Sequence, residues 1–398
     1  MFVFKSELIN KFMSYRKFLN NFYIYRFFKD FAFIYAVYVI LFRLRGLSIF
    51  EISILLAVWA AFVVIFEIPT GALADRWNRK YMLVLGMLSK AVGFLIWIFA
   101  NSFSLFLLGF LFWSIQSTFC SGTQEALLYD TLKSYRKQKE YKKIIGNGNF
   151  YGSIAIGSSM IIGGFLASIS FNIVLILSSL AMIVSMLAAS AFKEIRFKRT
   201  STQETKYIQL IRSAIKRSMR NRFLLRLMLY SLIVFALVGT LDEYDQLFIG
   251  LVGVPLAFFG IWGAIRFGSE ALGGKIAYKI EEYFKSKYVI YILSLLSGIC
   301  LLISISFPSI FVLPIYVLIY FLISISDVFV EGELQKQIKT HERATIISIN
   351  HFMENISSIA FLSGFGILSA IGGLYSGFLF FALLFIVYSI ISIIGLKK

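Results

Sequence analysis

Several ionisable side chains stand inside long apolar runs of this sequence, where a charge needs a chemical reason. Asp30, Glu125 and Asp327 are acidic, and Arg266 lies four residues before Glu270. A charge at the centre of a membrane helix costs roughly 2.5 to 3.5 kcal/mol on insertion scales, so each is a functional hypothesis. A desolvated carboxylate holds a proton more tightly than one in water and can release it when its surroundings change. A carboxylate such as Asp30 can therefore load and release a proton.

Each of these charges also has a structural explanation. Arg26 lies one helical turn before Asp30, and the four-residue spacing of Arg266 and Glu270 puts both on one helix face. Either pair could be a buried ion pair rather than part of a gate. Glu125 would face the transport pathway or a neighbouring helix. Both explanations stay open.

Two further sets of charges invite simpler interpretations. Four residues are expected near the inner surface, where long side chains reach water or pair locally: Glu67, Lys90, His351 and Glu354. Three acids gather at the outer end of an apolar run, where a solvated rim is favoured over a vestibule that attracts cations: Asp242, Glu243 and Asp245.

Membrane helices must hold these residues. The chain has 398 residues, of which 59% are hydrophobic and 15% charged, with a mean hydropathy of +0.81. Soluble domains are about half apolar and a quarter charged. The runs are continuously apolar and often about 20 residues long, unlike the alternating strands of a membrane barrel. We predict an all-α integral membrane protein of about twelve spanning helices. The expected spans are 20–42, 50–70, 81–100, 103–129, 146–168, 171–192, 223–248, 254–274, 288–307, 309–332, 345–370 and 373–395.

The net charge of +18 is concentrated in alternate connectors, including those around 133–143 and 193–222. This is the positive-inside pattern, and it predicts that both termini and the basic loops are cytoplasmic. We expect a multi-pass protein of the bacterial plasma (inner) membrane. Nucleic-acid binding is not needed to explain the charge. Cys120 and Cys300 fall inside apolar runs and are interpreted as packing residues.

The two ends of the chain resemble each other. At an offset of about two hundred residues, Glu67 matches Glu270 and Glu125 matches Asp327. We predict an N-terminal six-helix half at 1–192, a basic cytoplasmic loop at 193–222 and a C-terminal six-helix half at 223–398. Repeated halves imply a substrate site near the membrane midplane and alternating access by rocking.

A short charged connector separates the second and third predicted spans. It resembles the motif Gly-x-Leu-Ala-Asp-Arg-x-Gly-Arg-Lys of the major facilitator superfamily of secondary transporters. The matching residues are Gly71, Leu73, Ala74, Asp75, Arg76, Arg79 and Lys80. Asn78 replaces the second Gly, and Asn tolerates left-handed backbone geometry, so the turn need not be lost.

The resemblance implies roles for the motif. In this superfamily the motif's Asp faces the start of the eleventh helix, here near Ile346, and its second Arg pairs with an acid ending the fourth. Those residues would be Asp75, Arg79 and Asp130. Together they would form a latch that holds the two halves in the outward-facing state.

Motifs of other functions are absent from the sequence. It contains no phosphate-binding loop, no His-Glu-x-x-His segment and no nucleophile elbow, so neither a cofactor nor an enzyme activity is expected. We predict a monomeric secondary transporter in the lipid bilayer. The alternatives of another class are an intramembrane enzyme and a non-transporting receptor. The favoured function is proton-coupled efflux of amphipathic or cationic small molecules. Proton-coupled uptake of a nutrient such as a sugar is the alternative.

Overall fold

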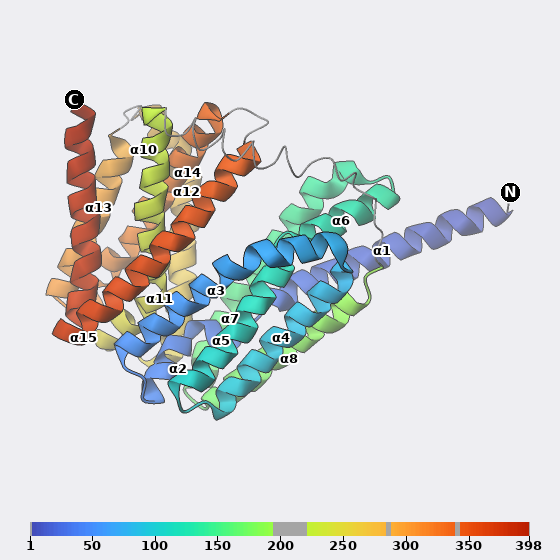
Figure 1. The fold of residues 1–398 in the computed structure, drawn as a ribbon, viewed down its shortest axis with the longest axis horizontal. Coiled ribbons are helices and arrows are strands. Elements are labelled where there is room, and N and C mark those ends of the chain that lie inside the picture. The colour runs from blue at the N-terminus through green and yellow to red at the C-terminus, as the bar shows by residue number, and fades with distance from the viewer. Residues whose placement is uncertain (1, 194–220, 284–287, 339–342, 398) are drawn as a thin grey trace. The chain divides into compact units, whose positions relative to one another are not determined.

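The computed structural model of the chain describes residues 2–193, 221–283, 288–338 and 343–397. Within these ranges every regular element is a helix (Figure 1). Nine helical stretches in the described ranges are long and apolar enough to cross a membrane. The predicted all-α membrane fold is confirmed.

The contacts within the chain divide it into two compact units. The first unit comprises Met1–Leu41, Phe62–Arg199 and Leu256–Ile261, and the second comprises Phe42–Ala61, Thr200–Pro255 and Trp262–Lys398. The division into halves at 193–222 stays a prediction, because residues 194–220 lie outside the described ranges.

Residues 2–193 form the following helices. They are α1 (Phe2–Asp30), η1 (Phe33–Ala36), α2 (Tyr38–Leu44), α3 (Ile49–Arg76), α4 (Arg79–Phe99), α5 (Phe103–Cys120), α6 (Thr123–Ser134), η2 (Gln138–Glu140), α7 (Tyr141–Ala167) and α8 (Phe171–Ser190). In the first unit, α4 packs against α5 and α8, and α1 packs against α7 and α8. Gly109 of α5 leaves room for Trp97 of α4, whose Nε1 donates to the Phe106 carbonyl at 3.1 Å. Small residues let membrane helices approach closely in this way.

Two predicted spans are wrong as continuous helices. The span 20–42 breaks after Asp30, and the span 103–129 breaks between Cys120 and Thr123. Gly122 has a φ of +67°, a conformation that glycine adopts at little cost and that ends a helix. Apolar residues lie on both sides of each break, so the sequence prediction joined the two flanking helices into one span.

Residues 221–397 form the remaining described helices. They are α10 (Arg222–Tyr230), η3 (Ser231–Phe235, a π turn), α11 (Ala236–Leu251), η4 (Leu256–Phe258), α12 (Phe259–Tyr283), α13 (Val289–Ser306), η5 (Ile310–Val312), α14 (Leu313–Gln337) and α15 (Arg343–Lys397). In the second unit, α13 packs against α14 and α15, and α11 packs against α15. The last two predicted spans run together in α15, which is interrupted at Gly373 with a φ of 76°.

The charged connector is shorter than predicted. Gly71 to Arg76 form the last turns of α3, and only Trp77 and Asn78 link it to α4. Asn78 has a φ of −72°, so the expected left-handed geometry is wrong. Its side chain instead accepts a hydrogen bond from the Tyr81 amide at 3.3 Å and caps α4. An Asn therefore suits this position because it begins a helix.

Candidate functional site

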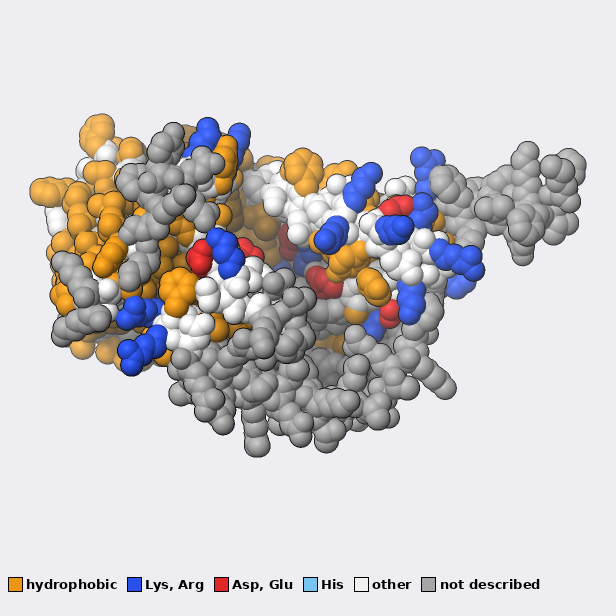
Figure 2. Space-filling view, turned by 90° about the horizontal axis from the view of Figure 1, so that it is seen from above, with side chains coloured by type: hydrophobic (Ala, Val, Ile, Leu, Met, Phe, Trp, Pro, Cys, Tyr) orange, Lys and Arg blue, Asp and Glu red, His pale blue; other side chains and the backbone are white. Residues whose placement is uncertain are grey.

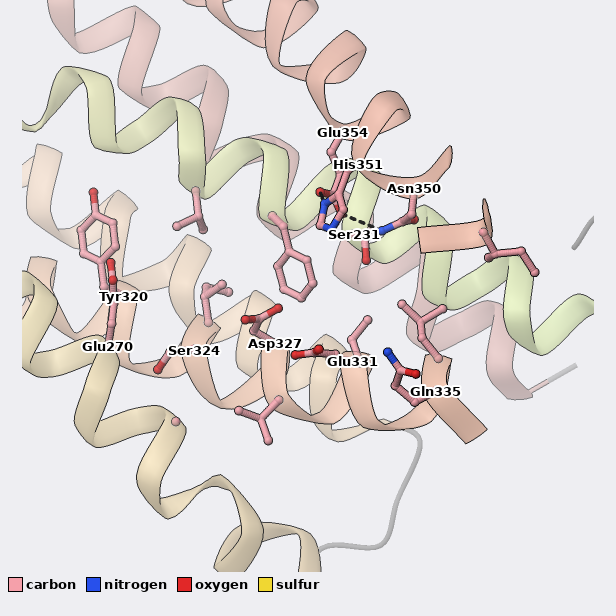
Figure 3. Close-up of a pocket in the computed structure, with 18 of the residues that line it drawn as sticks. Ser231, Glu270, Tyr320, Ser324, Asp327, Glu331, Gln335, Asn350, His351 and Glu354 are labelled. Atoms are coloured by element: carbon pink, nitrogen blue, oxygen red, sulfur yellow. Dashed lines mark hydrogen bonds and ion pairs between the residues drawn. The ribbon is translucent and has the colours of Figure 1, made fainter. Parts of the chain in front are cut away.

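A pocket of about 580 Å³ lies within the second unit. The π turn η3, α12, α14 and α15 all contribute to it (Figure 3). Ten of its polar side chains are labelled there: Ser231, Glu270, Tyr320, Ser324, Asp327, Glu331, Gln335, Asn350, His351 and Glu354. The π turn is a local widening of the helix that often accompanies functional sites, and it presents Ser231 and Phe235 to the pocket.

Two carboxylates of α14 face this pocket one helical turn apart. Asp327 and Glu331 are both exposed, and the structure gives neither an ion-pair partner among the described residues. Like charges at this spacing repel each other, so a proton or a cation between them is favourable. The pair can therefore take up positive charge from outside the protein.

A second pair on α15 lies across the pocket. His351 Nδ1 is 3.0 Å from Glu354 Oε2, and Asn350 Nδ2 donates to Glu354 Oε1 at 2.7 Å. Figure 3 shows His351 and Glu354 facing Asp327 and Glu331. The sequence interpretation of His351 and Glu354 as surface groups near the membrane missed their place in this pocket.

Asp245 of α11 is buried beside the pocket, so the expected solvated rim is wrong for this residue. It is only 4% exposed. Its Oδ1 accepts hydrogen bonds from the hydroxyls of Tyr316 at 2.7 Å and Tyr320 at 2.6 Å, and its Oδ2 accepts from Trp262 Nε1 at 2.9 Å. Three donors satisfy a carboxylate inside the protein and hold it in place. Tyr320 also lines the pocket.

Arg266 of α12 is 5% exposed and pairs mainly with Asp242 of α11. Its Nε lies 4.0 Å from Glu270 Oε1, at the limit of an ion pair. The guanidinium also lies 5.2 Å from the Tyr320 ring centroid. The sequence predicted an Arg266–Glu270 pair, and the structure adds Asp242 as the nearer partner. Glu270 is thereby left at the pocket wall.

The first unit holds a different polar cluster. Arg26 of α1 is 9% exposed and donates to Gln124 Oε1 at 3.2 Å and to Asn149 Oδ1 at 2.8 Å. The hydrogen bonds described for Arg26 go to these two amides, and the ion pair described for Asp30 is with Lys29 Nζ at 4.0 Å. The Asp30 Oδ2 would lie 2.9 Å from a Cβ at Gly152, so that glycine admits α1 against α7.

Glu125 follows directly in the same cluster. Its Oε1 accepts from Gln124 Nε2 at 2.7 Å, while its Oε2 is buried with no hydrogen-bond partner. Glu125 stands in the first turn of α6, where the helix dipole favours a negative charge. The Arg26 and Glu125 side chains are thus linked through one amide.

Lys90 lies in the middle of α4 and is 3% exposed, so its expected reach toward the inner surface is wrong. Its Nζ donates to the Tyr35 hydroxyl at 2.5 Å. The ammonium also lies 4.9 Å from the Trp113 ring centroid and 5.0 Å from that of Tyr35. Aromatic faces attract a cation, and more strongly away from water.

The connector residues divide into described and undescribed groups. Arg79 Nη1 lies 2.6 Å from Asp130 Oδ2, and both side chains are mostly buried. The latch role of this pair stays a prediction. The side chains of Asp75 and Arg76 lie outside the described part, so their predicted contacts are untested. A Cβ at Gly71 would meet no atom within 4 Å, and Lys80 lies 6.0 Å from the Tyr81 ring centroid.

No signal in the sequence selected Tyr316, Tyr320, Trp262 or Glu331, and sequence reasoning placed Asp245 at a solvated rim. Asp245 carried a signal, because it follows Asp242 by three residues and so can share its helix face. The phenol and indole donors carried none, because aromatic residues make up 17% of the chain.

The chain resembles known transporters over most of its length. The profile described as Major Facilitator Superfamily matches residues 22–362. A protein described as an uncharacterized transporter, from Buchnera aphidicola subsp. Schizaphis graminum (strain Sg), is 33% identical over 102 residues, and the match spans 25% of each chain.

Solved structures show the same fold at low sequence identity. A mutant of the nucleoside transporter NupG is 14% identical, with a TM-score of 0.78 over 96% of this chain and all of that one. A bacterial homolog of the human lysosomal transporter Spinster, in an inward-facing and unoccupied conformation, is also 14% identical. Its TM-score is 0.71 over 95% of each chain. At this identity the likeness establishes the fold alone.

Proposed function

Because this chain belongs to the Major Facilitator Superfamily, we propose that it is a proton-coupled secondary transporter that exports cationic or amphipathic small molecules. The observation that carries the proposal is the acidic pocket of the second unit. Asp327 and Glu331 stand one turn apart there, opposite His351 and Glu354. Four of the labelled lining residues are acidic and none is Lys or Arg. Such a lining attracts cations and disfavours anions.

Proton coupling has a simple physical basis at this pocket. A cation and a proton compete for the same carboxylates, because each neutralises the repulsion between Asp327 and Glu331. A proton that arrives from the acidic side therefore displaces the cation, and loss of that proton restores the site. His351 beside Glu354 provides a second proton acceptor within hydrogen-bond distance.

The neutral groups of the pocket favour the alternative function. Ser231, Ser324, Gln335 and Asn350 also line it, and hydroxyl or amide groups are suited to a neutral polar substrate. Uptake of a nutrient therefore remains the second candidate. NupG is a nucleoside transporter of the same fold, which gives a first substrate to test.

Transport into inverted membrane vesicles tests the proposal. Vesicles that contain the parent chain should accumulate lipophilic cations when an imposed gradient makes the lumen acidic, and should stop when the gradient is collapsed. Asp327→Asn should abolish accumulation, whereas Glu333→Gln should not, because Glu333 pairs with Lys336 on the same helix outside the pocket lining. Flux that is independent of the gradient would exclude proton coupling. Transport of nucleosides but not cations would favour uptake.

A further inference from the structure

The connection between α6 and α7 carries a dense positive charge that the proposed transport pocket does not use. Between residues 133 and 143, six residues are Lys or Arg and only Glu140 is acidic. The six are exposed, and we call them the basic rim: Lys133, Arg136, Lys137, Lys139, Lys142 and Lys143. Figure 2 shows several groups of Lys and Arg side chains on this face of the molecule, with acidic side chains beside some of them.

The backbone of the basic rim is fixed by hydrogen bonds. The Lys137 amide donates to the Leu132 carbonyl at 2.8 Å, and the Arg136 amide donates to the Lys133 carbonyl at 3.1 Å. This is the Schellman pattern at the end of α6, with Arg136 at a φ of 59° in the position that usually holds glycine. These bonds fix Arg136 and Lys137 at the end of α6, while Lys139 lies in η2 and Lys142 and Lys143 lie in the first turn of α7.

A distant part of the chain adds to the same surface. Tyr15 of α1 stacks near Tyr135, with ring centroids 5.2 Å apart, and Arg16 and Lys17 are exposed beside it. The Tyr15 hydroxyl donates to Glu140 at 2.7 Å. Burial and this hydrogen bond raise the pKa of the Tyr15 hydroxyl well above its ordinary value, so it stays a donor.

Glu140, the one acid between residues 133 and 143, accepts hydrogen bonds from two side chains. Lys137 Nζ also donates to Glu140, at 2.5 Å. Lys137 and Tyr15 therefore both donate to the Glu140 carboxylate. Arg136, Lys139, Lys142 and Lys143 are exposed, and Glu140 is the one acid in the sequence between residues 133 and 143. The positive-inside rule depends on the number of cations near a helix end. It does not require two distant segments to fold onto one surface.

Tyrosines place the basic rim at the edge of the membrane. The rings of Tyr129 and Tyr141 lie 5.8 Å apart beside the rim, and Tyr129 is 47% exposed. Tyrosine is enriched where the hydrocarbon meets the headgroups. Clusters of four to eight Lys or Arg at this depth bind anionic lipids.

We propose that the basic rim binds the anionic headgroups of phospholipids in the surrounding bilayer. The ligand chemistry is a phosphate group that carries a net negative charge, such as that of phosphatidylglycerol, whereas zwitterionic phosphatidylcholine gives no net attraction. The site is separate from the acidic pocket, so its failure and that of the proposed transport function are measured independently.

Native mass spectrometry of the full chain in detergent tests the proposal. The protein is titrated with phosphatidylglycerol or with phosphatidylcholine, and the affinity of the first bound lipid is measured. We expect Lys139→Gln, Lys142→Gln and Lys143→Gln together to weaken phosphatidylglycerol binding about 100-fold, from the strength of a cation near an anionic surface. The corresponding triple substitution to Arg should bind like the parent, because it keeps the charge.

A matched control has the same charge change elsewhere. Lys275, Lys279 and Lys336 are exposed on α12 and α14, and their combined substitution to Gln should leave the affinity unchanged. The proposal is overturned if the rim Gln variant binds like the parent, if the control loses as much, or if millimolar inorganic phosphate displaces the lipid. The last result would assign the rim to a free anion.

Discussion

In the first unit the buried Lys90 and Arg26 donate hydrogen bonds to neutral side chains, whereas in the second unit the buried Arg266 pairs with Asp242 and the buried Asp245 accepts from phenol and indole donors. Lys90 is enclosed by aromatic rings and one hydroxyl, and Arg26 donates to two amides. Asp245 instead receives three hydrogen bonds. The described part of the second unit also holds a pocket lined by acids. Polar side chains therefore satisfy each other in the first-unit cluster, whereas in the second unit several acids face open space.

Glu125 and Asp327, the two acids matched in the sequence comparison, show this difference most directly. Glu125 is held by Gln124 within a packed cluster, whereas Asp327 opens onto a pocket opposite His351 and Glu354. The two positions that the sequence comparison matched therefore have different surroundings. A carboxylate that faces a pocket can exchange its proton or its ligand, and a packed one can do so only when its neighbours move.

Removal of the Asp245 carboxylate should have the largest effect. Asp245→Ala leaves the Tyr316, Tyr320 and Trp262 donors unpartnered, and we expect it to lower the free energy of unfolding by about 4 kcal/mol. Thermal or denaturant unfolding in detergent measures the change. Asp245→Asn keeps an acceptor and should cost less than half as much. Equal losses in the two variants would show that hydrogen bonding does not stabilise this cluster.

Loss of the pocket acid should come next. We expect Asp327→Asn to slow proton-driven transport at least about 100-fold, the scale on which a positioned proton-transfer group acts. Glu125→Gln should slow it by less than about tenfold, because its side chain already contacts an amide. Initial rates in inverted vesicles give both values. If Glu125→Gln were the more damaging, the coupling site would belong to the first unit instead.

Substitution of the buried cation should have a smaller effect of opposite sign. Lys90→Met keeps most of the side-chain volume and removes a charge that makes no ion pair within 4 Å among the described residues, Asp30 acting on it only from farther away. We expect a gain of about 1 kcal/mol in the free energy of unfolding, because replacing a buried ion by an apolar group is often stabilising. Unfolding midpoints of the parent and the variant provide the comparison. A loss above about 2 kcal/mol would mean that the aromatic cage stabilises the ammonium more than burial penalises it.

The Arg79–Asp130 pair should show the smallest coupling. A double-mutant cycle with Arg79→Ala and Asp130→Ala should give an interaction energy of about 1 kcal/mol, since both side chains keep some contact with solvent. Unfolding of the four proteins gives the cycle. An interaction energy near zero would show that the pair does not stabilise the fold. Any role of the predicted latch would then have to be found in transport rates.

The class of fold could be predicted from the sequence because its signals are local. Apolar runs of helical length and the motif at Gly71 to Lys80 are each made of consecutive residues, so they can be recognised without knowing the fold. The roles of individual charges were harder to predict. The motif's Asp75 lies outside the described side chains, so its predicted contact stays open.

The candidate site depended on contacts between distant residues. Asp245 looks like a surface acid until Tyr316 and Tyr320 of α14 are placed beside it, some 70 residues later in the chain. Lys90 looks like a surface cation until Trp113 covers it. Hydropathy reports how apolar a segment is but not which partner satisfies a polar atom. Arg266 illustrates both cases, because its spacing to Glu270 was visible while its nearer partner Asp242 was on another helix.

The break at Gly122 makes α6 a helix separate from α5. The element has 12 residues, which corresponds to a length of about 18 Å. It begins at Glu125 and its neighbours, carries Asp130 against Arg79, and ends at the first cation of the basic rim. Because α6 is one short helix, a shift of α6 as a rigid element would displace Glu125, Asp130 and Lys133 together. The Arg79–Asp130 pair couples any such shift to α4.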